Sequence, residues 1–540
     1  MGGCGSSTNN LRHNTAQNNT MDGEETDGSA KPKQHVAISR VQETEASMSP
    51  FGKSMSAPES PSGSSGDLIA GTKKNKLLAK LISKWAEHLT LDASGKVTMD
   101  EEPRPIVPGP DLDEHDEDVL ATHVEQCLEG KGGELSAISH AVRLGNTYDV
   151  LSLESKQKLF YLLKNKFGVD TNATKAGCER ILAVGETDDV ERAKVMKELS
   201  TAMAPRYLRL FKLFNNGLFA GSSGVAFLVK LRSELITLLK QHPQLRELDT
   251  CLCDLLSAWF DLSFLELKHV TWDGSPASVM ELLMKHEAVH KIQSWDDMRN
   301  RLQGDRRVYA YFHPKMYQVP LIFVEVALVN GIPNRIGDLL AQNRDNIDPK
   351  QADTAAFYSI TNTQSGLAQI SFGNFLVKKA AMLLRKELPN LKTFVTLSPV
   401  PGFCKWLLDN ESAWPLSAEH IAMLDAAREG DSESRTDALR KLARRGEGRQ
   451  ILVMLAAFYF LKEKARGNKP RDPVSRFHLN NGASLHRIHV GADMSENGVK
   501  QSAGIMVNYL YRFEDVETNH ESYCDGIVKA STEVMDLLAA

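Results

Sequence analysis

The chain has 540 residues, of which 42% are hydrophobic and 25% charged, and a formal net charge of −5. Such values are typical of a soluble globular protein with room for two domains and terminal tails. The acidic balance and the absence of a dense basic segment argue against a nucleic-acid partner, and no apolar run reaches the roughly 18 residues of a membrane-spanning helix.

Residues 1–66 differ from the rest because they contain one aromatic residue and are rich in Ser, Asn, Gly and Thr. This composition predicts a disordered tail. The tail begins MGGCGS, which fits the M-G-x-x-x-[ST] pattern for N-myristoylation of Gly2, and Cys4 offers a site for a palmitoyl chain. One acyl chain binds a membrane marginally and two bind it stably, so we expect the tail to anchor the protein at a membrane surface.

Three features of the sequence bear on the compartment. Acidic residues interrupt the tail, which argues against a mitochondrial transit peptide. The sequence ends Leu538-Ala539-Ala540 instead of the peroxisomal S-K-L. Seven cysteines occur without a Cys-x-x-Cys pair, which suits a reducing compartment. The expectation is a cytoplasmic, membrane-associated protein that is not evidently mitochondrial or peroxisomal.

Residues 67–260 are expected to form a helical domain. Residues 73–88 read as an amphipathic helix, and helical periodicity is nearly continuous over 119–260, with a break expected at Gly145-Asn146. The acidic cluster at 111–118 between these stretches lacks the ligand order of a calcium loop, so the sequence predicts a solvated loop over 99–118.

Strands are expected only after residue 260, at 307–312, 321–328, 355–361, 392–397 and 505–513. Residues 355–398 form a strand-loop-helix-strand pattern, which predicts a right-handed parallel crossover. The helix expected at 374–388 follows a polar loop, and its free N–H groups could bind a phosphate. We therefore expect a mixed α/β domain over 261–540.

Two short segments carry candidate reacting side chains. Residues 396–403, TLSPVPGF, place Ser398 at the end of an apolar strand, and residues 472–483, DPVSRFHLNNGA, contain His478. A hydroxyl and an imidazole can together hold or move a proton, so the two residues are a candidate dyad.

These segments resemble the L-S-P-x-P-G-F and N/D-P-V-x-x-F-H-L-x-N-G-A blocks of the malonyl-CoA decarboxylase family. The resemblance continues in GVAFLVKLR at 224–232, in the stretch around 259–272 and in EAVH at 287–290. It covers roughly residues 150–540, and its motifs occur in the family's order.

The resemblance implies an α+β multidomain protein in which the helical domain precedes a catalytic domain with the N-acetyltransferase (GNAT) fold. It implies decarboxylation of malonyl-CoA to acetyl-CoA and CO2 without a metal or organic cofactor, and a homo-oligomer formed through the helical domain. His478 would protonate the α-carbon, because imidazole titrates near neutral pH. Ser398 would hold the malonyl carboxylate or relay a proton. Ser359 and Tyr511 match polar residues of the same site. The CoA-binding turn matches Ala368, Gln369, Ile370, Ser371, Phe372, Gly373 and Asn374.

Other interpretations were weighed. Residues 286–290, HEAVH, fit the zinc motif HExxH in a stretch with helical periodicity, but no third ligand follows at the expected spacing. A GNAT-type acyltransferase would need an amine-binding site, for which the sequence has no signal. A catalytically inactive CoA-binding scaffold is disfavoured by the presence of Ser398 and His478.

Overall fold

The computed structural model describes residues 89–91, 97–99, 105–107, 109–184, 188–219, 222–370, 373–409, 417–425, 427, 431–444 and 446–538. All of them lie in one of the two units into which the chain divides, Trp85–Ala540. The tail at 1–66, its acylation motif and the helix expected at 73–88 lie outside the described residues. A short antiparallel pair, β1 (Leu89–Leu91) and β2 (Val97–Met99), comes first.

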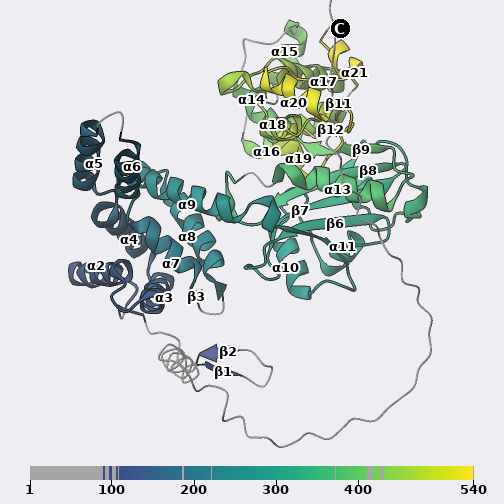
Figure 1. Ribbon diagram of the computed structural model, residues 1–540. Helices are drawn as coiled ribbons and strands as arrows, with labels where there is room; N and C mark the ends of the chain where they lie inside the picture. Colours follow the sequence, from purple (N-terminus) through teal and green to yellow (C-terminus); the bar gives the residue numbers. More distant parts are fainter. Residues whose placement is uncertain are drawn as a thin grey trace, which may run out of the picture. The chain divides into compact units, whose positions relative to one another are not determined.

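A helical region follows and agrees with the predicted helical class (Figure 1). Apolar residues recur on one side of its helices; in α9, for example, Leu248, Leu252 and Leu256 are buried at a spacing of four residues. A two-residue hairpin, β3 (Leu218–Phe219) and β4 (Ser222–Ser223), interrupts it. The helices are α2 (Glu114–Glu129), α3 (Glu134–Val150), α4 (Leu153–Phe167), α5 (Thr171–Ala183), α6 (Asp189–Met203), α7 (Tyr207–Asn215), α8 (Gly224–Leu238), η1 (Pro243–Leu245) and α9 (Arg246–Trp259).

Three predictions for this region were wrong. Strands also occur before residue 260, in the short pairs β1–β2 and β3–β4. The acidic cluster does not stay a loop as far as residue 118, because α2 begins at Glu114. The Asp113 carboxylate accepts the backbone N–H of Asp116 at 2.8 Å, and the carboxylate of Asp116 accepts that of Asp113 at 3.3 Å. Acidic residues are favoured in a first turn by the helix dipole. Gly145 does not break α3; a Cβ there would lie 2.2 Å from the Phe219 ring, so the glycine makes room for an aromatic side chain.

A mixed sheet forms the second part of the unit, in the order β10-β12-β9-β8-β7-β6-β5, with β11 also paired to β12. The pair β8–β9 is parallel, and the other strand pairs described in this sheet are antiparallel. The strands are β5 (Glu266–Val270), β6 (Arg306–Phe312), β7 (Pro320–Val329), β8 (Thr354–Asn362), β9 (Thr393–Thr396), β10 (Ser398–Pro399), β11 (Ser484–His489) and β12 (Met506–Leu510).

The five predicted strands are present, and in this sheet the sequence missed β5, β11 and the two-residue strand β10. Strands β5 and β11 are rich in polar or charged side chains and are partly exposed, so they lack the apolar run that marked the others. The predicted helical connection between parallel strands is confirmed: α13 (Gly373–Glu387) joins β8 to its parallel neighbour β9. This mixed sheet agrees with the GNAT-like catalytic domain that the resemblance implied.

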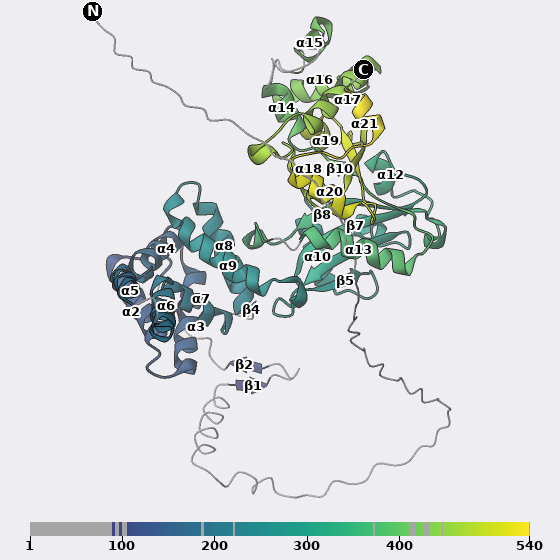
Figure 2. The ribbon, with the colours of Figure 1, turned by 45° about the horizontal axis from the view of Figure 1, so that its top comes forward.

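Helices cover both faces of the sheet. Along β6, Val308 and Ala310 pack with α10 (Ala277–His286) and α11 (Trp295–Asn300), whereas Tyr309 and Tyr311 pack in the cluster that contains α13. Successive side chains of a strand point to opposite faces, so the two helical layers lie on opposite sides. Figures 1 and 2 both show α13 against β7 and β8.

The C-terminal helices surround the strands β10, β11 and β12, where aromatic side chains such as Phe403 and Tyr459 pack together. The remaining helices of this part are η2 (Leu262–Phe264), α12 (Ile336–Leu340), η3 (Pro349–Gln351), η4 (Ser365–Leu367), α14 (Phe403–Asp409), α15 (Ala418–Asp425), α16 (Ser432–Arg444), α17 (Gly446–Leu461), η5 (Arg466–Asn468), α18 (Pro473–Asn480), α19 (Glu496–Ser502), α20 (Val516–Cys524) and α21 (Thr532–Asp536).

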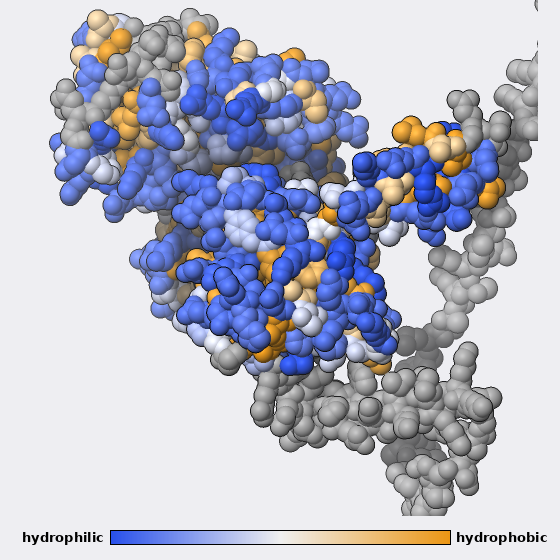
Figure 3. Space-filling model, turned by 90° about the vertical axis from the view of Figure 1, so that its left-hand side faces the viewer, coloured by the Kyte–Doolittle hydropathy of each residue, from blue (hydrophilic) through white to orange (hydrophobic). Residues whose placement is uncertain are grey.

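The described surface is mainly hydrophilic, with scattered apolar side chains, on the face drawn in Figure 3. In α5, whose residues are all described, none is buried. Leu182 in α5 and Val190 in α6 are 86% and 83% exposed. No helix in the described ranges is both long and apolar enough to cross a membrane.

Candidate active site

Ser398 lies where strand β9 continues into β10. Val395 pairs with Leu510 of β12, and Ser398 pairs with Val507 three residues further along both strands. The hydroxyl of Thr396 accepts the backbone N–H of Tyr509 at 3.1 Å, which fixes the strand just before the serine. The pairing with β12 therefore holds Ser398 as a buried residue, 6% exposed, at a fixed position.

His478 is held by the short helix α18. Asp472 caps this helix by accepting the N–H of Ser475 at 2.7 Å, and Pro473 occupies its first position, as is common at helix starts. The imidazole stacks on the ring of Tyr509, with 4.6 Å between the centroids. His478 is 2% exposed, so its orientation is set by the protein.

Ser398 and His478 are 80 residues apart in the chain, yet Nε2 of His478 lies 3.2 Å from Oγ of Ser398. On the other side of the ring, Nδ1 lies 2.9 Å from the hydroxyl of Tyr511. The hydroxyl of Ser398 donates to Oγ1 of Thr396 at 2.9 Å, so Oγ of Ser398 is left to accept from His478. This network places the imidazole hydrogen on Nε2, and Nδ1 then accepts from Tyr511.

Burial lowers the pKa of His478 to about 3. Removing an imidazole from water disfavours its charged form, and the contacts described above are with neutral hydroxyl groups. The expectation that this histidine titrates near neutral pH was therefore wrong. His478 is a neutral donor at pH 7, with its N–H directed at Ser398.

A cavity of about 380 Å³ opens onto this pair. Its size lies within the range of about 300–1,000 Å³ that is usual for small-molecule sites. The cavity brings together side chains from both signature segments, from strand β8 and from the predicted CoA-binding turn. The predicted site residues that line it are Ser359, Gln369, Ile370, Ser398 and His478.

Other predicted site residues lie elsewhere. Tyr511 is behind His478 and is not among the residues that line the cavity. Ala368 accepts a hydrogen bond from Arg232 with its carbonyl and does not line the cavity. Gly373 begins α13, whereas Ser371, Phe372 and the side chain of Asn374 lie outside the described residues.

Ser359 has a partner that the sequence did not reveal. Its hydroxyl lies 2.8 Å from each carboxylate oxygen of Glu287, and Thr361 donates to the same carboxylate at 3.2 Å. Glu287 also accepts the backbone N–H groups of Val289 and His290. Ser359 and Glu287 are 72 residues apart, so spacing alone gave no signal.

The zinc interpretation expected residues 286–290 to lie in one helix, and this expectation was wrong. Helix α10 ends at His286, so His286 and His290 do not share a helix face. Glu287 is 5% exposed and its carboxylate is occupied by hydroxyl and N–H donors. Among the described residues, no group of three or more His, Cys, Asp or Glu side chains is placed to hold a metal ion.

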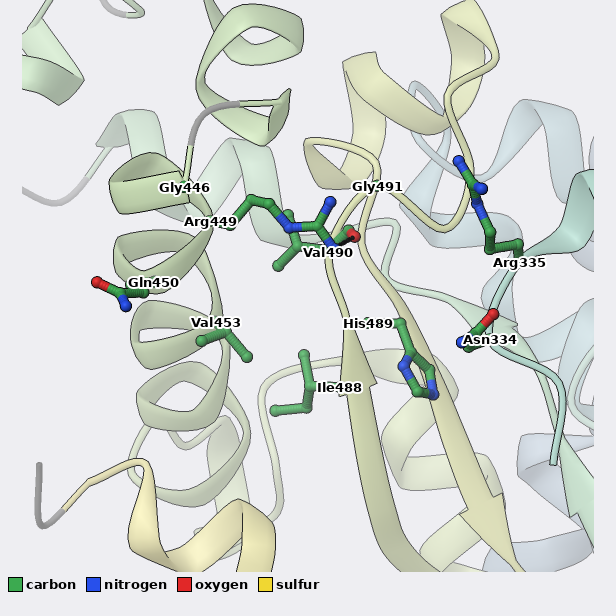
Figure 4. Close-up of a pocket in the computed structure, with 10 residues that line it drawn as sticks. All are labelled: Asn334, Arg335, Gly446, Arg449, Gln450, Val453, Ile488, His489, Val490 and Gly491. Carbon is green, nitrogen blue, oxygen red and sulfur yellow. Dashed lines mark hydrogen bonds between the residues drawn. The ribbon is translucent and has the colours of Figure 1, made fainter.

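A larger hollow, of about 590 Å³, lies at the end of β11 and the start of α17 (Figure 4). Arg449 there donates to the carbonyl of Val490 at 2.8 Å, and Nε2 of His489 lies 2.6 Å from the side-chain oxygen of Asn508. Neither Ser398 nor His478 lines this hollow. The smaller cavity is therefore the candidate reaction site.

Comparison with known proteins identifies the family. Two family models match the chain: the malonyl-CoA decarboxylase N-terminal domain over residues 167–260 and the malonyl-CoA decarboxylase C-terminal domain over residues 263–540. The chain belongs to the malonyl-CoA decarboxylase family. The family predicted from the signature segments is thus confirmed, and the segments with Ser398 and His478 both fall within the C-terminal match.

Similar proteins include the mitochondrial malonyl-CoA decarboxylases of Anser anser anser and Rattus norvegicus. The first is 33% identical over 408 residues, which cover 71% of this chain and 80% of the relative. The second is 34% identical over 410 residues, which cover 71% and 82%. Both relatives are described as mitochondrial.

Solved malonyl-CoA decarboxylases have the same fold. The structure from Rhodopseudomonas palustris is 39% identical and gives a TM-score of 0.70, covering 78% of this chain and 99% of that one. The structure from Agrobacterium vitis is 38% identical, with a TM-score of 0.69 and the same coverage. The likeness therefore extends over the helical region and the mixed sheet together.

Proposed function

We propose that Ser398 and His478 carry out the conversion of malonyl-CoA to acetyl-CoA and CO2 that membership of this family assigns to the chain. The observation that carries the proposal is the 3.2 Å contact between Ser398 Oγ and His478 Nε2. This contact lies at a cavity that is also lined by Gln369 and Ile370 of the predicted CoA-binding turn.

The reaction breaks the bond between the α-carbon and the carboxylate carbon of the malonyl group. The electron pair of that bond passes into the thioester carbonyl and forms an enolate, while the carboxylate leaves as CO2. A proton then adds to the α-carbon to give acetyl-CoA. The protein must supply a hydrogen-bond donor for the developing oxyanion and a proton donor for the carbon.

His478 is placed to act as that donor. Its neutral imidazole directs an N–H from Nε2, and Tyr511 can return a proton to Nδ1 as Nε2 gives one up, so that no imidazole anion forms. After the product leaves, solvent that enters the cavity protonates Nε2 and Nδ1 returns its proton to Tyr511, which restores the starting state. Ser398 binds the malonyl carboxylate or relays the proton. The buried setting favours the loss of neutral CO2 from a charged carboxylate, because burying a charge is costly.

The turn from Ala368 to Asn374 is proposed to bind the phosphates of CoA. Gly373 starts α13, a helix of 15 residues, and the first N–H groups of a helix form a site for anions. Ser359 lines the adjacent cavity and is fixed by Glu287, so it contributes a positioned polar wall for the acyl end.

The helical region is proposed to form a homo-oligomer, as the sequence predicted. The support is the exposed apolar surface of the α5–α6 pair, where Leu182 and Val190 are more than four-fifths exposed. Burial of such side chains against a second copy would stabilise an assembly by roughly 25 cal/mol per Å² of apolar surface.

The N-terminus is proposed to carry a myristoyl group on Gly2 and a palmitoyl group on Cys4, which would place the enzyme at the cytoplasmic side of a membrane. The support is the MGGCGS motif, because two acyl chains give stable membrane binding.

One assay separates the proposed activity from its rivals. The purified protein is incubated with malonyl-CoA, with and without an amine acceptor, and acetyl-CoA, CO2 and acylated amine are measured. A decarboxylase forms acetyl-CoA and CO2 in equal amounts whether or not amine is present, and dialysis against EDTA leaves the rate unchanged. Acylated amine without CO2 would support an acyltransferase, and binding without turnover would support an inactive scaffold.

A further inference from the structure

Arg232 is a charged side chain buried inside the helical region. It lies in α8, within the GVAFLVKLR segment, and is 0% exposed. A guanidinium removed from water is strongly destabilising unless hydrogen bonds and an opposite charge compensate it. Its partners therefore indicate why a charge is placed there.

The hydrogen-bond partners of Arg232 are one carboxylate, which compensates its charge, and two backbone carbonyls. Its Nε donates to the carboxylate of Asp249 in α9 at 2.9 Å. Its Nη1 donates to two backbone carbonyls outside the helical region, those of Gly366 at 2.7 Å and Ala368 at 2.9 Å. The guanidinium thus joins two helices of the helical region to the loop between β8 and α13.

The loop is pressed against α8 at the same place. A Cβ built on Gly366 would lie 1.9 Å from the carbonyl oxygen of Val229, so no larger residue fits between loop and helix. Just after Ala368, Gln369 has a φ of +71°, a conformation that non-glycine residues adopt only when their surroundings hold them in it. The two hydrogen bonds from Arg232 are part of what holds it.

The direction of the peptide groups links this contact to the cavity. In a trans peptide the C=O and the following N–H point in opposite directions. Because the carbonyl of Ala368 points at Arg232, the N–H of Gln369 points away from it. Gln369 and Ile370 line the catalytic cavity, and α13 begins three residues later, at Gly373.

We propose that Arg232 is a positioning residue for substrate binding. It holds the carbonyls of Gly366 and Ala368 so that the N–H of Gln369 and the start of α13 face the phosphates of CoA. The inference rests on the proposed function, and it assigns the helical region a part in substrate recognition. Arg232 itself does not touch the substrate, so its removal weakens phosphate binding and leaves the chemical step intact.

The test compares two substrates, malonyl-CoA and malonyl-pantetheine, the second of which lacks the nucleotide and its phosphates. The variant is the double substitution Arg232→Gln with Asp249→Asn, which avoids leaving a buried carboxylate unpaired. Arg206→Gln is the control, because Arg206 forms an exposed ion pair with Glu125 in the same region. Thermal melting checks that every variant is folded.

The double variant is expected to lower kcat/KM for malonyl-CoA about tenfold or more, through KM, the scale of lost charge-assisted hydrogen bonds. Its kcat/KM for malonyl-pantetheine should stay within about threefold of the wild-type value, which is a smaller change than the loss of one typical hydrogen bond. Arg232→Lys, which keeps the charge but lacks the planar fork that spans two acceptors, should give an intermediate loss. The control should match the wild type.

Several outcomes would overturn the proposal. Equal losses for both substrates would indicate a general structural role, and no loss would remove Arg232 from recognition altogether. A wild type without preference for malonyl-CoA over malonyl-pantetheine would show that the phosphates are not recognised. Calorimetric affinities for CoA and pantetheine make the same comparison without turnover, so a failure of the proposed decarboxylation is distinguished from a failure of this inference.

Discussion

The hydroxyl of Tyr511 lies 2.9 Å from Nδ1 of His478, on the side of the imidazole opposite Ser398. The ring is thus held between two hydroxyl groups, one in β10 and one on the residue after β12, and its hydrogen is assigned to the nitrogen that faces Ser398. Tyr511 matched a substrate-site residue in the sequence, but the structure places it behind the histidine. We therefore expect the Tyr511 hydroxyl to assist His478 as the proton donor and not to bind the substrate.

Replacing Tyr511 with Phe tests that contribution. The change removes the hydroxyl that donates to Nδ1 and keeps the buried ring. We expect kcat to fall about tenfold, the effect of one hydrogen bond worth about 1.4 kcal/mol in the transition state, with little change in KM. Steady-state kinetics measure both constants. Tyr309→Phe on β6 is a matched control; a rise in KM with unchanged kcat in the Tyr511 variant would place its hydroxyl on the substrate instead.

The pKa of His478, lowered to about 3 by burial, makes a prediction about pH. In the folded protein the imidazole stays neutral at every pH well above 3, so it does not take up a proton near 6.5. We expect the resonances of His478 in isotope-labelled protein, assigned with His478→Gln, to stay constant between pH 5 and 8. A titration of these resonances centred near pH 6.5 would contradict the neutral-donor mechanism.

The exposed apolar side chains of α5 and α6 make a prediction about assembly. Replacing Leu182 or Val190 with Glu should reduce self-association, because a charge would then have to be buried at the interface. Sedimentation velocity at micromolar concentrations measures the change. Replacing the polar exposed residue Glu179 of α5 with Gln is the control. A wild type that is monomeric throughout this range would refute the oligomer itself.

The acylation motif makes a prediction about location. In cells that contain the acyltransferases, the wild type should sediment with membranes, and Gly2→Ala should be soluble because its N-terminus cannot receive myristate. Cys4→Ser should bind membranes weakly, since one acyl chain gives marginal binding. A soluble wild type, or equal sedimentation of wild type and Gly2→Ala, would show that acylation does not position this protein.

Much of the fold could be predicted because its signals are local. The apolar runs of β6, β7 and β8 marked these strands, and the loop-helix-strand pattern after β8 predicted the crossover. The polar strand β11 was missed because it has no such run. The acidic start of α2 was taken for a loop because the same residues that favour solvent also favour a helix N-terminus.

In the candidate site, too, some features could be predicted from the sequence and others could not. Ser398 and His478 could be found because each lies in a motif of contiguous residues. The contacts that set their surroundings join residues far apart in the chain: Glu287 with Ser359 across 72 residues and Arg232 with Gly366 across 134. The sequence around each of these residues does not indicate which distant residue it contacts. The lowered pKa of His478 likewise follows from burial, which only the folded chain reveals.

The most direct test of the account is the rate of acetyl-CoA formation from malonyl-CoA by Ser398→Ala and His478→Gln, compared with the wild type. His269→Gln, on the strand β5 at the opposite end of the sheet order, controls for the loss of an imidazole. The account predicts that both site variants, folded by thermal melting, lose about 10²-fold or more in kcat, the scale of acid–base catalysis, while the control keeps its activity. Wild-type turnover in either folded site variant would contradict the central claim that this pair performs the decarboxylation.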